Sequence, residues 1–184
     1  MQLYLVRHPQ PRNAAGLCYG RQDVAVDSDS LQRAASAVRE GIPERALQGA
    51  RIFSSPSQRC VQLARELAAP RDLVLADELL EMSFGVWEGR NWEALPRDQM
   101  DAWAADVWGY RPGGAESAAM VAVRWCRWST QIRRTMNENV VAVTHAGVIR
   151  VALACAGQLN TATFAQAAIG FGSVHRVDLG PFET

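Results

Sequence analysis

Short runs of apolar residues recur along the chain and are typical of β-strands. The first covers residues 3–6 and leads directly into Arg7 and His8. A second run, at residues 139–144, is as continuously apolar as the first, which is typical of a strand buried on both faces in a parallel sheet. Further strands are predicted at residues 51–54, 73–76 and 174–179, the last with alternating apolar and polar positions.

Longer segments with apolar residues at helical spacing lie between these runs and predict helices. They cover residues 31–47 (broken near Gly41), 57–69, 92–107, 115–136 and 147–156. Glu116 is expected in the first turn of the longest helix, where a negative charge suits the helix dipole. The alternation of strand and helix predicts one domain over residues 1–184, a three-layer α/β/α sandwich with a mostly parallel central sheet.

Two segments have neither period and are expected to be loops. Residues 9–20 follow the first strand, where open α/β sheets place their ligand-binding loops. Residues 77–89 mix acidic, aromatic and glycine residues in a manner typical of a functional loop.

Composition narrows the function classes. Nineteen basic and nineteen acidic side chains cancel, so the chain has no general electrostatic reason to bind nucleic acid or an anionic membrane. No apolar run approaches bilayer length and no signal-peptide pattern is present, which predicts a cytoplasmic protein. The four cysteines are scattered and are expected to be free thiols.

The candidate chemistry lies where predicted strands end. Two of the three histidines, His8 and His145, directly follow the two most continuously apolar runs. Arg7 precedes the first of them, and Arg59 falls in the first turn of the helix that follows residues 51–54. Because parallel strands end at one edge of a sheet, these four side chains are expected to converge. A nucleophilic imidazole surrounded by cationic donors suits phosphoryl transfer, in which negative charge spreads over three oxygens.

Two histidines could also bind a metal ion. That interpretation is weaker, because the accompanying side chains are arginines, which repel a cation, and no carboxylate motif lies beside either histidine. We therefore expect neither a metal nor another cofactor.

Four segments resemble the histidine phosphatase superfamily, also called the phosphoglycerate mutase-like family. They are LVRH (5–8), SSPSQRC (54–60), LLEMSFGVWEG (79–89) and THAGVIR (144–150), in the order in which that family has them. The segments CYGRQDV (18–24) and FGVWEG (84–89) look most like its α-ribazole phosphatase branch. The resemblance implies a phosphoglycerate mutase-like fold and a phosphomonoesterase acting on a small phosphorylated metabolite. The candidate substrate is α-ribazole 5′-phosphate, from cobalamin biosynthesis.

The resemblance also implies a role for individual residues. His8 is the phospho-acceptor, Glu81 donates the proton to the leaving group, and the phosphate pocket consists of Arg7, Arg59 and His145. Arg21, in the loop after the first strand, is a candidate phosphate or substrate contact, with a solvated loop arginine as the alternative. Trp87 and Glu116 are candidate substrate-pocket residues, although an alanine inserted before Glu116 departs from the family pattern. Pro9 also departs from it, because the family commonly has glycine there.

Two alternatives remain. One is phosphoglycerate mutase-type phosphoryl transfer, for which this chain has little room because such mutases carry additional segments over the site. The other is an inactive member that binds a phosphorylated ligand. It is disfavoured because His8, Arg7, Arg59, Glu81 and His145 are all present.

Overall fold

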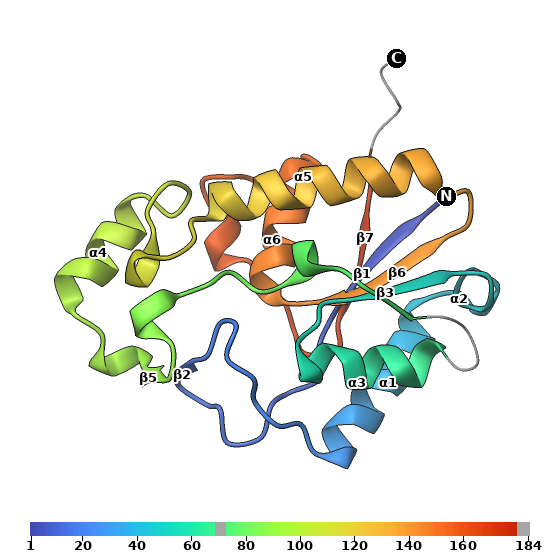
Figure 1. Ribbon diagram of the computed structural model, residues 1–184, viewed down its shortest axis with the longest axis horizontal. Helices are drawn as coiled ribbons and strands as arrows, with labels where there is room; N and C mark the ends of the chain where they lie inside the picture. Colours follow the sequence, from blue (N-terminus) through green and yellow to red (C-terminus); the bar gives the residue numbers. More distant parts are fainter. Residues whose placement is uncertain (69–72, 180–184) are drawn as a thin grey trace.

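A five-stranded sheet forms the centre of the computed structural model, which describes residues 1–68 and 73–179. The strand order is β4-β3-β6-β1-β7 (Figure 1). Four strands are parallel: β1 (Leu3–Arg7), β3 (Arg51–Ser54), β4 (Leu73–Leu75) and β6 (Val140–Thr144). The edge strand β7 (Val174–Val177) pairs with β1 in the antiparallel sense. The predicted mostly parallel sheet is therefore confirmed.

Helices cover both faces of this sheet, as the three-layer prediction requires. On one face lie α1 (Ser28–Gly41) and α3 (Gln58–Ala68), and on the other lie α5 (Ala118–Thr135) and α6 (Ala146–Cys155) (Figure 1). The shorter helices are α2 (Glu44–Gln48) and α4 (Arg97–Ala105), and α4 lies to one side of the layers. Single 3-10 turns occur at η1 (Asp77–Leu79), η2 (Gly85–Trp87), η3 (Trp92–Ala94), η4 (Pro112–Gly114) and η5 (Phe164–Gln166).

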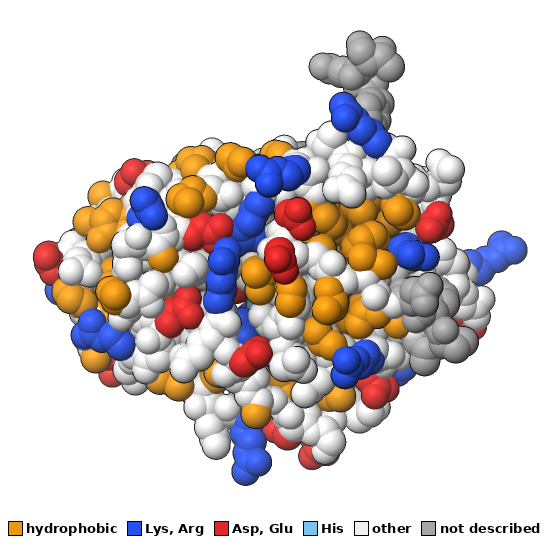
Figure 2. Space-filling view, in the orientation of Figure 1, with side chains coloured by type: hydrophobic (Ala, Val, Ile, Leu, Met, Phe, Trp, Pro, Cys, Tyr) orange, Lys and Arg blue, Asp and Glu red, His pale blue; other side chains and the backbone are white. Residues whose placement is uncertain are grey.

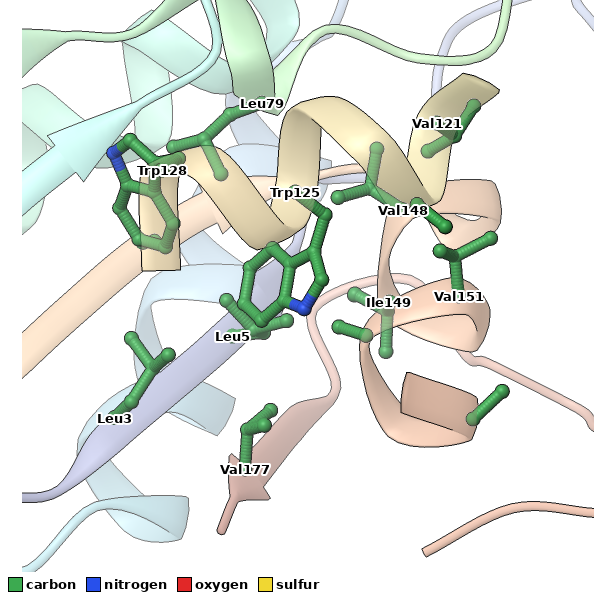
Figure 3. Packing of buried hydrophobic residues seen from close by; sticks show 14 of the residues in the cluster. Leu3, Leu5, Leu79, Val121, Trp125, Trp128, Val148, Ile149, Val151 and Val177 are labelled. Carbon is green, nitrogen blue, oxygen red and sulfur yellow. The ribbon is translucent and has the colours of Figure 1, made fainter. Parts of the chain in front are cut away.

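The continuous apolar runs are explained by burial on both faces of the sheet. In β1, Leu3 and Leu5 pack into the cluster under α5 and α6, whereas Tyr4 and Val6 pack into the cluster under α1 and α3. Figure 3 shows the first cluster, with Trp125 of α5 lying over Leu5. Because alternate side chains of a strand point to opposite faces, a strand with helices on both sides has no position for a polar residue.

Capping residues set the starts of two long helices. Asp27 accepts from the backbone N–H of Ser30 at 2.7 Å, so α1 begins three residues before the predicted start. Ser117 caps α5 by accepting from the N–H of Met120 at 3.3 Å. The expectation that Glu116 occupies the first turn of this helix is therefore wrong, because Glu116 precedes the capping residue and is free to face another part of the molecule.

The other predicted boundaries need smaller changes. The predicted helix at 92–107 is interrupted by Pro96, which precedes α4. Of the predicted helix at 57–69, α3 covers most, and Ala69 lies outside the described residues. The expected loop at 9–20 contains a two-residue strand, β2 (Leu17–Cys18), which pairs with β5 (Arg90–Asn91). This pairing ties the loop after β1 to the residues that directly follow the segment at 77–89. That segment has no strand or α-helix, as expected, but contains the η1 and η2 turns.

Charges of both signs are interspersed over the face shown in Figure 2. The helices that the structure describes, within residues 1–68 and 73–179, include none that is both long and apolar enough to cross a membrane.

Candidate active site

Sheet register brings the two predicted histidines together. Arg7, the last residue of β1, lies opposite Thr144, the last residue of β6, so His8 and His145 follow at the same level. The N–H of His8 donates to the carbonyl of Thr144 at 3.0 Å. The two imidazole centroids are 5.1 Å apart, and both side chains are buried. The expected convergence at this sheet edge is present in the structure.

The ring of His8 is held by the residue that follows it. Its Nδ1 lies 2.7 Å from the carbonyl oxygen of Pro9, which can only accept, so Nδ1 carries the proton and Nε2 has a free lone pair. Burial, followed by the positive charge of Arg59, lowers the pKa of His8 to about 3. His8 is therefore a neutral imidazole at neutral pH. Pro9 stands where the family commonly has glycine. Its carbonyl oxygen orients the His8 ring, and this contact does not require a backbone N–H at position 9.

Arg59 is a fully buried guanidinium that links three elements. Its Nη1 donates to the carbonyl of Gln22 at 2.8 Å, and its Nη2 donates to the carbonyl of Gly20 at 2.6 Å. The same Nη2 lies 3.2 Å from Nδ1 of His145. Arginine has no acceptor atom, so this contact requires Nδ1 of His145 to be unprotonated.

His145 is consequently neutral, with its proton on Nε2. That nitrogen lies 2.8 Å from the hydroxyl oxygen of Ser55, at the end of β3. Burial, together with the neighbouring His8 and Arg59, lowers the pKa of His145 well below its usual value. Ser55 is a residue that the sequence interpretation did not single out, although it stands within the segment SSPSQRC.

Two buried donors at this site have no hydrogen-bond partner among the described residues. They are Nε of Arg7 and Nε of Arg59. A buried N–H without a partner costs free energy, and an anion placed between the two guanidinium groups would remove that cost. These two guanidinium groups are therefore candidate donors for an anionic group.

Glu81 lies in the irregular segment after β4, with both carboxylate oxygens held by backbone N–H groups. Oε1 accepts from Met82 at 2.9 Å, and Oε2 accepts from Gly147, in the first turn of α6, at 3.2 Å. Glu81 and Arg7 line the same cavity. A carboxyl group thus stands with Arg7 at the wall of this cavity.

Glu116 and Arg21 occupy different positions from those expected. The Glu116 carboxylate accepts from Nε of Arg124 at 2.9 Å, from Nη2 of Arg21 at 3.1 Å and from the N–H of Ser83 at 3.2 Å. Burial raises the pKa of Glu116, but the hydrogen bonds and charge of Arg124, with smaller contributions from Ser83 and Arg21, outweigh burial, so the net pKa is lowered. Glu116 does not line the cavity, which corrects its assignment to the substrate pocket.

Arg21 supports the segment that carries Glu81. Its Nε donates to the backbone carbonyl of Glu81 at 3.1 Å, while its Nη2 binds Glu116. In the structure it is neither a free loop arginine nor a member of the buried cluster formed by Arg59 and the two histidines.

The cavity beside the cationic cluster has a volume of about 260 Å³. Its polar residues are Arg7, Tyr19, Glu81 and Arg150. The remaining wall is largely apolar and includes Leu17, Met82, Phe84, Trp92, Trp103, Val107, Val121, Val151 and Phe164. Such a cavity suits a ligand with one anionic end and one apolar end.

Trp87 does not belong to this wall. Its ring is completely buried, and Nε1 donates to Gln99 at 3.0 Å. The expectation that Trp87 lines the pocket is therefore wrong, because the η2 turn directs the ring into the small core beside Cys18 and Leu95. Trp92 and Trp103 line the cavity instead.

Within residues 1–68 and 73–179, no group of three or more His, Cys, Asp or Glu side chains is placed to hold a metal ion. Metal independence stays a prediction.

The fold is an α/β sandwich, and two neutral histidines and a buried arginine meet at one edge of its sheet. Residues 3–183 match the family model described as "Histidine phosphatase superfamily (branch 1)". The chain belongs to this superfamily.

Two curated relatives and one solved structure show the range of similar proteins. A 6-phosphofructo-2-kinase/fructose-2,6-bisphosphatase of Caenorhabditis elegans is 30% identical over 83% of this chain and 33% of its own length. A metal-independent phosphoserine phosphatase of Arabidopsis thaliana is 29% identical over 81% of this chain and 66% of its own length. The crystal structure of the α-ribazole phosphatase from Shigella flexneri has a TM-score of 0.82 and 21% identity, covering 98% of this chain and 91% of that one.

These comparisons confirm the predicted superfamily and the phosphoglycerate mutase-like fold. The family match and the phosphoserine phosphatase relative support the expected enzyme class, a hydrolase of phosphate monoesters. The chain spans only about a third of the length of the Caenorhabditis elegans relative, and the solved structure supports a likeness of fold alone.

Proposed function

We propose that the protein is a phosphomonoesterase that hydrolyses a small phosphorylated metabolite through a phosphohistidine on His8. The observation that carries this proposal is the hydrogen bond from Nδ1 of His8 to Pro9, which leaves Nε2 as the nucleophilic atom. The unpartnered Nε atoms of Arg7 and Arg59 supply the donors for the phosphate oxygens. Donors of this kind stabilise the charge that develops during phosphoryl transfer.

The reaction proceeds in two displacements. First, the lone pair of His8 Nε2 forms a bond to phosphorus, the bond to the ester oxygen breaks, and that oxygen takes a proton from Glu81. Then water attacks the phosphohistidine and gives a proton to Glu81, while the electron pair of the N–P bond returns to Nε2. The products are the alcohol and inorganic phosphate, and one difficult displacement has been replaced by two easier ones.

Our candidate substrate is α-ribazole 5′-phosphate, which would place the enzyme in cobalamin biosynthesis in the cytoplasm. The aromatic part of the cavity supports this choice, because Phe84, Trp92 and Trp103 pack against one another with centroids 5.4–6.1 Å apart. Planar aromatic groups bind well to such surfaces. Phosphoserine lacks an apolar group that would fill this wall.

A panel of phosphate monoesters, assayed for released phosphate in EDTA and again with added Mg²⁺, tests the proposal. We expect hydrolysis without metal and a higher kcat/KM for α-ribazole 5′-phosphate than for phosphoserine. Trp103→Leu should raise KM for the first substrate and leave a short alkyl phosphate unaffected. Equal effects of Trp103→Leu on both substrates would contradict the role of the aromatic wall.

The same panel separates the two alternatives. Transfer of phosphate to 3-phosphoglycerate without release of inorganic phosphate would favour a mutase. Phosphate binding without turnover of any monoester would favour an inactive binding member.

A further inference from the structure

Phe171 is a large apolar side chain that stays 41% exposed beside the candidate nucleophile. Its ring centroid is 5.6 Å from that of His8, and the guanidinium carbon of Arg7 lies 3.6 Å from the ring centroid. Phe171 does not line the cavity, although Arg7 does. The ring therefore covers one face of Arg7 without forming part of the cavity wall.

The backbone around Phe171 is fixed to the end of β1. The N–H of Gly172 is shared between the carbonyls of Arg7, at 3.1 Å, and His8, at 3.4 Å, and the N–H of Arg7 donates to the carbonyl of Ser173 at 3.1 Å. The hydroxyl of Ser173 closes the turn by donating to Gly170 at 2.6 Å. The backbone turn that carries the ring is thus hydrogen-bonded to Arg7 and His8.

The position after Phe171 requires glycine. Gly172 has φ +70°, and a Cβ atom there would lie 3.0 Å from Cα of Ala34 in α1. A side chain at this position would therefore displace the turn that presents Phe171.

The contacts of the Arg7 guanidinium indicate how the Phe171 ring affects it. Nη1 of Arg7 donates to the carbonyl of Ile169, and Arg7 and Tyr19 line the same cavity. Nε is buried without a partner. With one flat face covered by an aromatic ring and Nη1 bound to a backbone carbonyl, the guanidinium is restrained to one plane at the cavity wall.

We propose that Phe171 is a positioning residue, which stacks on Arg7 and holds its guanidinium in the plane that binds the transferring phosphoryl group. This inference rests on the proposed function, because it concerns the same site. The inference goes beyond the proposed function by assigning a role to a residue outside the four segments that resemble the superfamily.

The test is a double-mutant cycle between Phe171 and Arg7, using Phe171→Leu, which keeps an apolar side chain but removes the ring face. In the wild-type background, Phe171→Leu should lower kcat/KM for p-nitrophenyl phosphate and weaken orthovanadate binding, measured by calorimetry, by about 5- to 30-fold. In the Arg7→Ala background the same change should cost less than about 2-fold. Phe171→Tyr, which retains the ring, should behave as wild type.

The control is Val123→Ala, which truncates another exposed apolar residue, on α5, and should change neither readout. Equal losses from Phe171→Leu in both backgrounds, no loss in either, or a Phe171→Tyr variant as impaired as Phe171→Leu would overturn the inference. Orthovanadate binding requires no turnover. A wild-type protein that binds vanadate but hydrolyses no monoester would therefore overturn the proposed function and not the role of Phe171.

Discussion

Gly147 lies directly against the carboxyl group of Glu81. Its N–H donates to Oε2 at 3.2 Å, and a Cβ atom at position 147 would overlap with Oε1. The first turn of α6 therefore holds the candidate acid in place only because residue 147 has no side chain.

Gly147→Ala should consequently reproduce the loss of the acid. The atom that the new methyl group meets is the end of a flexible side chain, so the carboxyl group moves while the fold persists. We expect hydrolysis of alkyl phosphates to fall by about 10- to 100-fold, with a melting temperature close to that of wild type. The control is Gly49→Ala, whose Cβ would meet only the carbonyl of Arg45 at 3.8 Å. Wild-type kinetics in Gly147→Ala would contradict the assigned position of Glu81.

The identity of the acid can be tested by the basicity of the leaving group. Glu81→Gln should slow an alkyl phosphate by about two powers of ten or more, because an alkoxide needs a proton to leave. The p-nitrophenyl ester, whose leaving group needs no proton, should be slowed much less. Equal losses on both substrates would mean that Glu81 binds or positions the substrate instead of protonating it.

Glu116→Gln is the matched comparison for that experiment. Its carboxylate is bound by Arg124 and Arg21, and its lowered pKa makes it a poor proton donor. We expect this variant to lose stability, by about 3 kcal/mol, because it leaves the partly buried Arg124 without its ionic partner. Leaving-group dependence in Glu116→Gln and not in Glu81→Gln would transfer the acid role to Glu116.

Stability should depend on pH because both site histidines resist protonation in the folded state. The pKa of His8 is lowered to about 3, and that of His145 is lowered well below 6.5. Between these values and 6.5 the unfolded chain binds protons that the folded chain does not. The stability that the two neutral histidines contribute should therefore be complete above about pH 6.5. On acidification the free energy of unfolding should fall by about 1.4 kcal/mol per pH unit for each histidine.

Urea unfolding between about pH 6.5 and pH 5 measures this slope in a range where carboxyl groups contribute little. His8→Asn should reduce the pH dependence of the free energy of unfolding by the contribution of one histidine. A slope equal to that of wild type would mean that His8 titrates normally in the folded protein.

Arg59→Lys tests whether a charge alone suffices at this position. A lysine ammonium cannot repeat the planar set of contacts with Gly20, Gln22 and His145 while also facing a phosphate. We expect kcat/KM to fall by about 10²- to 10³-fold, as for loss of an oxyanion donor. Arg97→Lys, which changes an exposed ion pair with Asp101, is the control and should leave activity unchanged.

The sequence predicted those parts of the site that follow from strand ends. His8 and His145 could be expected to meet because each directly follows a continuously apolar strand. The parallel register, with Arg7 opposite Thr144, then places the two histidines side by side. Arg59 could be placed because α3 begins a few residues after β3. Helix starts were less predictable, since the hydrogen bond from the N–H of Met120 to the Ser117 hydroxyl, and not the apolar pattern, excludes Glu116 from α5.

The cavity wall could not be predicted for a different reason. Which tryptophan faces the cavity depends on how the η2 turn and α4 are placed relative to each other, and the apolar pattern does not specify this. Trp87 turns inward and Trp103 turns toward the cavity, although their rings are in contact, with centroids 5.9 Å apart. Phe171 was missed because its importance depends on stacking across β1, which no local pattern indicates.

The most direct test of the account is to look for phosphate on His8. Wild-type protein, quenched during turnover of a labelled phosphomonoester, should carry phosphate that is stable in base and labile in acid. Mass spectrometry should locate it on the peptide that contains His8. Turnover without label on that peptide, or near-wild-type hydrolysis by His8→Ala, would contradict the phosphohistidine mechanism.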